Sequence, residues 1–198
     1  LHALRWPVAR GRGQIQALDA VPLPSGEVRI AFGGNGVYPS SVVLIDSKNV
    51  TATRTLEPQD LKARYQQTLA VQFHPKRPDI LAVGYGGRAA GSEKGFETSS
   101  AKIILWQIND TGEKRLLTMD TGISNADAVA FSDDGERFAA CDFDSGSVKE
   151  WRLTLDSRST AKSTETIETH TQLHGLIFCK HDGWQVATQT HGLIAPAR

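Results

Sequence analysis

Apolar and polar residues alternate in short runs along most of this chain. The clearest example is 126–155, where three runs are separated by two polar turns that end in glycine, Asp133-Asp134-Gly135 and Asp144-Ser145-Gly146. Alternation with a period of two is typical of a strand, whose successive side chains lie on opposite faces, and glycine supplies the positive φ of a tight hairpin. The pattern predicts three antiparallel strands, at 126–131, 137–143 and 148–155.

The same order of parts occurs four times. The first part is an apolar strand that leads into a turn, at 17–26, 69–79, 126–135 and 173–183. The second is a strand rich in small residues that ends at glycine, at 27–36, 80–87, 137–146 and 184–192. The third carries Trp106 and Trp151 at equivalent places and lies at 41–47, 102–110, 147–153 and 193–198. A weaker fourth strand at 52–56, 114–119 and 165–170 completes an expected sheet of four antiparallel strands.

Repeats of about 40 to 45 residues with four strands each favour a β-propeller over a two-layer sandwich. We therefore predict an all-β fold in one domain, 1–198, a propeller whose four-stranded antiparallel blades lie near 15–56, 66–120, 124–170 and 171–198, the last one incomplete. A further strand is expected at 1–8, before the first blade. Segment 57–67 is a candidate for one or two helical turns, although a loop fits it equally well.

Two stretches of the chain resemble blades of the WD40-repeat family. One is AVAFSDDGERFAACDFDSGSVKEWRL, at 128–153. The other is LAVQFHPKRPDILAVGYGG, at 69–87, together with KIILWQI, at 102–108. The resemblance implies a propeller fold and a role in binding other proteins.

The two stretches depart from the family's pattern in three places. The aspartate that usually follows the tryptophan is replaced by Gln107 in one unit and by Arg152 in the other, and Ser145 stands where a turn aspartate is expected, one position after Asp144. The Gly-His pair that often precedes a blade is also missing. We therefore expect the family's fold without the buried hydrogen-bond network that those residues form.

WD40 propellers usually close into a ring of seven blades. Closure matters because a ring has no exposed sheet edges between its first and last blades, whereas this sequence supplies about four blades. We expect either a propeller of about four blades or part of a larger, seven-bladed ring. The remaining blades would come from a longer parent chain, which we favour, from a second chain, or from a copy of this chain.

Composition narrows the classes of partner and compartment. The 22 basic and 22 acidic residues give a net charge of zero, so no overall field attracts nucleic acid or an anionic membrane. No apolar run reaches the ~20 residues of a membrane span. Cys141 and Cys179 are too few for a disulfide scaffold and fit a reducing, cytoplasmic location. The glycosylation triplets at 49–51 and 109–111 are common by chance, and we expect them to be unused.

Two patterns have the residue types of a phosphate or metal site without the spacing. The glycines at 33–36 lack the Lys-Ser/Thr pair and the following helix of a phosphate loop. Zinc-ligand residue types are clustered near the C-terminal end, at His170, His174, Cys179 and His181. Residues five apart in a strand point to opposite faces, so we expect no metal there.

The remaining reactive residue types are expected to be structural. Cys141 lies in a strand among alanines, where a thiol acts as a small apolar side chain. His74 and His191 stand at strand ends, where histidines are more often turn residues than catalysts. We therefore predict that the chain is not an enzyme and needs no cofactor.

The longest interruption of the repeat is an insertion at 88–100, between the second and third strands of its unit. Hairpin loops usually contain about 2 to 5 residues, so a loop of this length tends to be functional or disordered. Its arginine, lysine and phenylalanine are residue types that anchor interfaces. In WD40 propellers the same rim is the usual docking surface for peptides and domains. We therefore predict a protein or peptide partner that contacts Tyr38, Arg64, Tyr65, Arg88, Lys94, Phe96, Asn125, Asp144 and His191.

Two other functions stay open beside this non-catalytic scaffold or interaction module. A propeller enzyme, either a hydrolase or a quinoprotein-like oxidoreductase, would need polar or charged residues that point into the central channel, whereas the innermost strands at 69–73 and 126–131 are mostly apolar. A glycan-binding propeller would expose Trp6, Tyr85 and Trp184 in repeated pockets, because sugars stack on aromatic faces.

Overall fold

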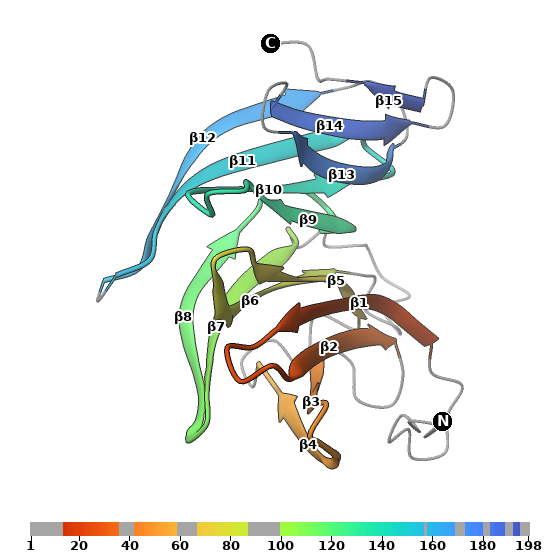
Figure 1. Cartoon of the computed structure of the whole chain (residues 1–198). Helices are drawn as coiled ribbons and strands as arrows, with labels where there is room; N and C mark the ends of the chain where they lie inside the picture. The colour runs from red at the N-terminus through yellow and green to blue at the C-terminus, as the bar shows by residue number, and fades with distance from the viewer. Residues whose placement is uncertain are drawn as a thin grey trace.

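The computed structural model describes residues 14–35, 42–58, 67–86, 100–156, 158–168, 173–179, 183–188 and 192–194. These residues form β-strands and turns, and no helix occurs among them, so none of the described chain forms a helix that could cross a membrane. The strands make four sheets that are stacked in chain order (Figure 1). The predicted all-β fold is confirmed.

Within each sheet, strands that follow one another in the chain pair in an antiparallel manner. Sheet 1 consists of β1 (Gln14–Pro22), β2 (Val28–Asn35), β3 (Val42–Asp46) and β4 (Asn49–Leu56). Sheet 2 consists of β5 (Gln67–His74), β6 (Arg77–Gly86), β7 (Lys102–Asn109) and β8 (Gly112–Asp120). Sheet 3 consists of β9 (Ala128–Phe131), β10 (Arg137–Asp142), β11 (Ser147–Thr154) and β12 (Thr160–Glu168). Sheet 4 contains β13 (Leu173–Cys179), β14 (Gly183–Thr188) and β15 (Gly192–Ile194). One bridge, Asn35 to Gln67, makes sheets 1 and 2 formally continuous.

The two tryptophans of the repeat occupy corresponding environments, as the sequence predicts. Trp106 of β7 is paired with Leu81 of β6, and Trp151 of β11 is paired with Phe138 of β10. Each tryptophan also directly follows a register shift in the pairing of its strand with the outermost strand of the sheet. Sheets 2 and 3 are therefore copies of one module at the level of strand register.

The predicted hairpin turns of sheet 3 are also confirmed. Gly135 and Gly146 have φ values of 77° and 72°, in the left-handed region that glycine adopts readily. The Asp134 carboxylate accepts a hydrogen bond from the Glu136 backbone N–H at 2.9 Å, which closes the first turn. The sequence signal for these turns was strong because the turn geometry depends on a few adjacent residues.

The outermost strands are longer than predicted. β12 begins at Thr160 rather than at 165, and β4 and β8 extend beyond 52–56 and 114–119. Most of the described β12 side chains are exposed, so its first half shows no apolar alternation that could reveal a strand. Glu57 and Pro58 are not helical. The rest of the candidate helix, 59–66, and the strand expected at 1–8 lie outside the described residues.

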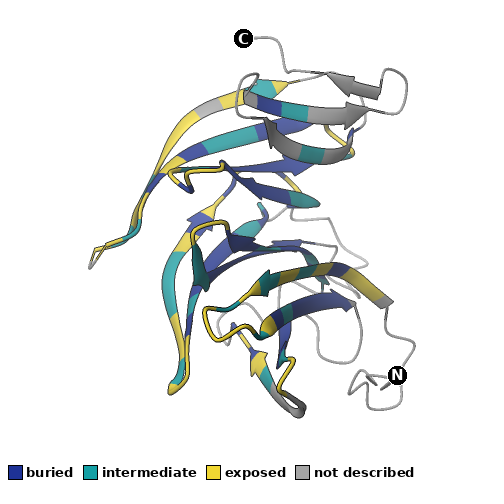
Figure 2. Ribbon diagram, in the orientation of Figure 1, coloured by how far each residue is buried: buried dark blue, intermediate teal, exposed yellow. Residues whose placement is uncertain are grey.

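Apolar side chains fill the space between each pair of successive sheets. In β7, Ile104, Trp106 and Ile108 belong to the core shared with sheet 1, whereas Ile103 and Leu105 belong to the core shared with sheet 3. Because neighbouring side chains of a strand point to opposite faces, β7 is buried on both faces. Figure 2 shows the same distribution, with buried residues in the middle of the stack and exposed residues at the hairpin tips.

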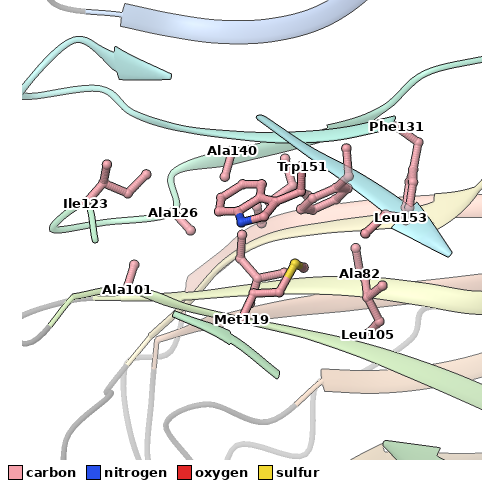
Figure 3. Close-up of a cluster of buried hydrophobic side chains, with 14 residues drawn as sticks. Ala82, Ala101, Leu105, Met119, Ile123, Ala126, Phe131, Ala140, Trp151 and Leu153 are labelled. Carbon is pink, nitrogen blue, oxygen red and sulfur yellow. The ribbon is translucent and has the colours of Figure 1, made fainter. Parts of the chain in front are cut away.

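The core between sheets 2 and 3 is built around Trp151. Its indole is 3% exposed and its ring centroid lies 6.1 Å from that of Phe138. Figure 3 shows the indole between Ala140 and Met119, which belong to the same buried cluster. Alanines at 82, 101, 126 and 140 let the sheets approach closely enough for this large ring to fill the gap.

Side chains on the first strand of one sheet hydrogen-bond to the first strand of the next. Asp19 Oδ2 accepts from the Phe73 N–H at 2.6 Å, and Gln72 Oε1 accepts from the Phe131 N–H at 2.7 Å. Asp19 and Gln72 are equivalent, because they pair with Ala31 and Ala82 at the same place in sheets 1 and 2. Burial raises the pKa of the Asp19 carboxyl, against the hydrogen bond from Phe73, which lowers it.

Candidate functional site

The described part of the predicted docking surface lies at one edge of sheets 2 and 3. We call the loop rim the residues Gly86, Ser100, 120–127 and 142–147. A Cβ atom placed on Gly86, the last residue of β6, would lie 2.9 Å from the Asn125 side-chain oxygen. The end of β6 therefore lies directly beside the connection between β8 and β9.

The end of the insertion is attached to the same connection. The Thr121 hydroxyl donates to the Ala101 carbonyl at 2.8 Å, and the Ala101 N–H donates to the Ile123 carbonyl at 2.7 Å. Asp120 accepts hydrogen bonds from Ser100 and Lys102. Gly86 and Ser100, the described residues on either side of 87–99, thus both lie against 120–125.

Asp142 joins the connection to the turn between β10 and β11. The side chain is fully buried, and its Oδ2 atom accepts from the backbone N–H groups of Ser124 and Asn125, each at 3.1 Å. Its Oδ1 atom accepts from the N–H groups of Asp144 and Ser145, at 3.0 and 3.1 Å. One carboxylate therefore holds both loops in a fixed relative position.

Asn125 and Asp144 are the two predicted contact residues that the structure describes, and Asp142 brings them onto one surface. Asp144 is exposed and Asn125 is partly exposed. The other predicted contact residues lie outside the described residues, namely Tyr38, Arg64, Tyr65, Arg88, Lys94, Phe96 and His191. The sequence places Asp142 near the end of the strand predicted at 137–143, but it does not reveal the bonds to 124–125, because these residues are 17 and 18 positions away.

The pKa values of two loop-rim carboxylates, Asp120 and Asp127, are shifted in opposite directions. Burial raises the pKa of Asp127, the Phe143 N–H lowers it, and the neighbouring carboxylates of Asp142 and Asp144 raise it further. Hydrogen bonds from Lys102 and then Ser100 lower the pKa of Asp120. Despite this concentration of acids, no three His, Cys, Asp or Glu side chains in the described ranges are grouped so that they could hold a metal ion.

Cys141 and two aromatic residues are buried rather than available for chemistry. Cys141 is a free, fully buried thiol, and burial raises its pKa, which confirms its role as a small apolar side chain. Tyr85 is 0% and Trp184 is 5% exposed, so neither presents an aromatic face to a sugar. Trp6 lies outside the described residues. The same holds for the side chains of the cluster in which we expect no metal, His170, His174, Cys179 and His181.

The indole N–H of Trp106 takes no part in a hydrogen-bond network of the described residues. Its Nε1 atom is buried and has no hydrogen-bond partner among them, and the Arg115 guanidinium lies 5.5 Å from the ring centroid. The residue that follows this tryptophan is Gln107 rather than the aspartate on which the expected network of the resembled family depends.

His74 is a structural residue at the end of β5. Its ring is 5% exposed and lies 5.0 Å from the Phe131 ring. The Nδ1 atom accepts hydrogen bonds from the Lys76 and Arg77 N–H groups, both at 3.1 Å, which requires a deprotonated Nδ1. Burial lowers the pKa of His74, the Gly135 backbone raises it, and the nearby charges of Arg77, Asp79 and Lys76 change it by smaller amounts.

Protonation of His74 is expected to destabilise the fold in mild acid. Since burial holds the folded pKa of His74 below the usual histidine value of about 6.5, the stabilising contribution of the neutral ring is fully present above that value and is lost as the pH falls through the folded pKa. The free energy of unfolding should therefore fall as the pH is lowered below about 6.5. Urea unfolding at several pH values measures this loss, which His74→Gln should lack. An equal loss in the variant would assign the pH dependence to other groups.

Comparisons with known proteins support the fold. No protein-family profile and no curated protein sequence match the chain. The β-propeller domain of Swd1 from Myceliophteria thermophila is 11% identical, with a TM-score of 0.59 over 94% of this chain and 55% of that one. A chain of the mitotic checkpoint complex is 20% identical, with a TM-score of 0.57 over 83% of this chain and 45% of that one.

A third similar structure comes from an enzyme-like propeller. It is a Bacteroides fragilis protein with a provisional assignment as a 6-phosphogluconolactonase, which is 9% identical, with a TM-score of 0.55 over 76% of this chain and 38% of that one. The chain therefore spans about half the length, or less, of the structures that it matches. The stacked antiparallel sheets and these likenesses together identify the fold as a β-propeller, in which each sheet corresponds to a blade.

Proposed function

We propose that the chain is a non-catalytic interaction module that binds a protein or peptide partner through the loop rim. The observation that carries the proposal is the buried Asp142 carboxylate, whose four backbone hydrogen bonds hold 124–125 and 144–145 together. Binding loops on a rigid scaffold lose less conformational entropy when a partner docks. Gly86 and Ser100, which flank 87–99, lie against the same frame.

Two further points support a protein partner. One of the similar structures is a component of a multiprotein assembly, the mitotic checkpoint complex. The net charge of zero gives no attraction to nucleic acid or to an anionic membrane. In this proposal the partner is a cytoplasmic protein, and further blades would come from a longer parent chain or a second chain.

Site-specific photo-crosslinking tests the proposal. A photoreactive side chain is placed at Asn125 or at Asp144, and in matched controls at Asp133 or at Lys48, which are exposed turn positions away from the loop rim. The first two positions are expected to capture the same protein from a cell extract. A chain in which 88–99 is replaced by a short Gly-Ser linker should capture it about tenfold less. Equal capture at the control positions, or capture unchanged by the linker, would contradict the proposal.

A propeller enzyme is the alternative that the lactonase-like structure favours. Its test is hydrolysis of 6-phosphogluconolactone by the purified chain, compared with the spontaneous rate. If the chain hydrolyses the lactone faster than the spontaneous rate, and still does so after 88–99 is replaced, the result would support an enzyme and contradict a non-catalytic module. Hydrolysis at the spontaneous rate is the result we expect.

A further inference from the structure

A groove of about 300 Å³ opens between sheets 2 and 3, at the edge opposite to the loop rim. One wall comes from β8, and the other comes from the turn that follows β11. Arg77, at the start of β6, also contributes. The groove is lined by Arg77, Gln107, Lys114, Leu116, Leu155, Asp156 and Ser159.

The corresponding place between sheets 1 and 2 is crossed by an arginine. Arg54 of β4 donates to the Asn109 carbonyl at 2.6 Å and pairs with Glu113 at 3.5 Å, so the outer strand of sheet 1 is joined to the β7–β8 hairpin. The position equivalent to Arg54 in sheet 2 is Leu117, because Leu44 pairs with Arg54 and Leu105 pairs with Leu117. Leucine cannot form such a bridge.

Arg77 is held in place at the groove. Its Nη1 atom donates to the Leu155 carbonyl at 2.9 Å, and its Nη2 atom donates to Asp79 at 3.2 Å. Gln107 donates to the same Asp79 oxygen at 3.1 Å. The guanidinium is therefore positioned in advance, which reduces the entropy lost when a ligand binds.

The charges and apolar surfaces of the groove define what it accepts. Lys114 is exposed and has no ion-pair partner among the residues that the structure describes. The lining carries two cations, Arg77 and Lys114, and one carboxylate, Asp156, which accepts from the Arg158 N–H at 2.8 Å. Asp79 also forms an ion pair with Arg77, at 3.2 Å, so Lys114 is the lining cation that lacks a carboxylate partner in the described part of the chain. Half-buried leucines at 116 and 155 add apolar surface beside these cations.

We propose that this groove binds a short acidic segment of a partner protein. A carboxylate of the segment lies between Lys114 and Arg77, and an aliphatic side chain of the segment packs against Leu116 and Leu155. Carboxylates are the natural partners of a fixed guanidinium and an unpaired ammonium group. The site shares no residue with the loop rim, so it stands or fails independently of the function proposed above.

Three capped peptides with two leucines each test the chemistry of the ligand: Leu-Glu-Leu-Asp, Leu-Gln-Leu-Asn and Leu-Lys-Leu-Arg. They are titrated into the isotope-labelled chain, and backbone amide shifts are followed by NMR. The acidic peptide should shift the amides of Leu155 and Ser159, bind about tenfold more tightly than its amide counterpart, and weaken as salt is added. Equal binding of the acidic and amide peptides would overturn the proposal.

Two variants of opposite expected effect separate binding from misfolding. Lys114→Glu should weaken the acidic peptide about tenfold, and Asp156→Asn should tighten it about twofold, because it removes the repelling carboxylate. Lys48→Glu, a matched charge reversal at a lysine whose side chain is 80% exposed in sheet 1, should change nothing. Affinities that do not respond to Lys114→Glu and Asp156→Asn would rule out the groove. Replacing 88–99, the insertion invoked for the loop-rim proposal, should leave peptide binding intact.

Discussion

Replacing Gly135 by alanine is expected to lower the free energy of unfolding by about 2 to 5 kcal/mol. Gly135 has a φ of 77°, which an L-residue adopts only at a cost. A Cβ atom on Gly135 would also lie closer than 3.0 Å to the Cε1 and Nε2 atoms of His74. The buried ring cannot swing away, because Phe131 packs against it and its Nδ1 atom is hydrogen-bonded. Urea unfolding followed by circular dichroism measures the loss.

Gly26→Ala is the matched control for this change. Gly26 has a similar φ of 83°, but nothing lies within 4 Å of its Cβ position, so it should lose only the backbone term of about 1 to 2 kcal/mol. Combining Gly135→Ala with His74→Ala removes the clash. The double variant should therefore lose less stability than the sum of the losses of the two single variants. Equal losses for Gly26→Ala and Gly135→Ala would show that the contact with His74 contributes nothing.

The second large effect is expected for Asp142→Ala, which should cost about 3 to 4 kcal/mol because four backbone N–H groups lose their acceptor. Each buried donor left unsatisfied costs about 1 to 3 kcal/mol, and solvent at the partly exposed loops recovers part of this. Asp142→Asn retains one acceptor oxygen and should lose about half as much. The change is measured by urea unfolding, with hydrogen exchange at 124–125 and 144–145 as a local readout.

Asp144→Ala serves as the control for Asp142. Asp144 is exposed on the same turn, and a surface substitution of this kind changes stability by less than about 0.5 kcal/mol. If Asp142→Ala speeds hydrogen exchange at 144–145 but leaves exchange at 124–125 unchanged, Asp142 does not join the two loops. In that case the rigid frame invoked for the loop rim would be wrong.

The sequence predicted the parts of the fold that depend on neighbouring residues. The apolar run of β10, the alternation in β11 and the glycines at 135 and 146 act over a few positions, so the strands and turns of sheet 3 could be assigned from them. The repeat then extended the same assignment to sheet 2. The first half of β12 was missed because an exposed outer strand needs no apolar face.

Contacts between distant parts of the chain could not be predicted. Arg77 and Leu155, which meet at the groove, are 78 residues apart, and Asp142 reaches back across the connection before β9. No local pattern encodes such pairs. Asn125 and Asp144, the two predicted contact residues that the structure describes, lie on a common rim because antiparallel strands return their loops to the same edge. Their contact with a partner stays a prediction.

Three of the four tryptophans each belong to a different buried cluster between sheets. Trp106 lies in the core between sheets 1 and 2, Trp151 in the core between sheets 2 and 3, and Trp184 in the core between sheets 3 and 4. Each junction therefore contains its own natural fluorophore. In chains that keep one of the three indoles and replace the others by phenylalanine, the emission wavelength would report when that junction admits water, so the order in which the stack comes apart could be read directly.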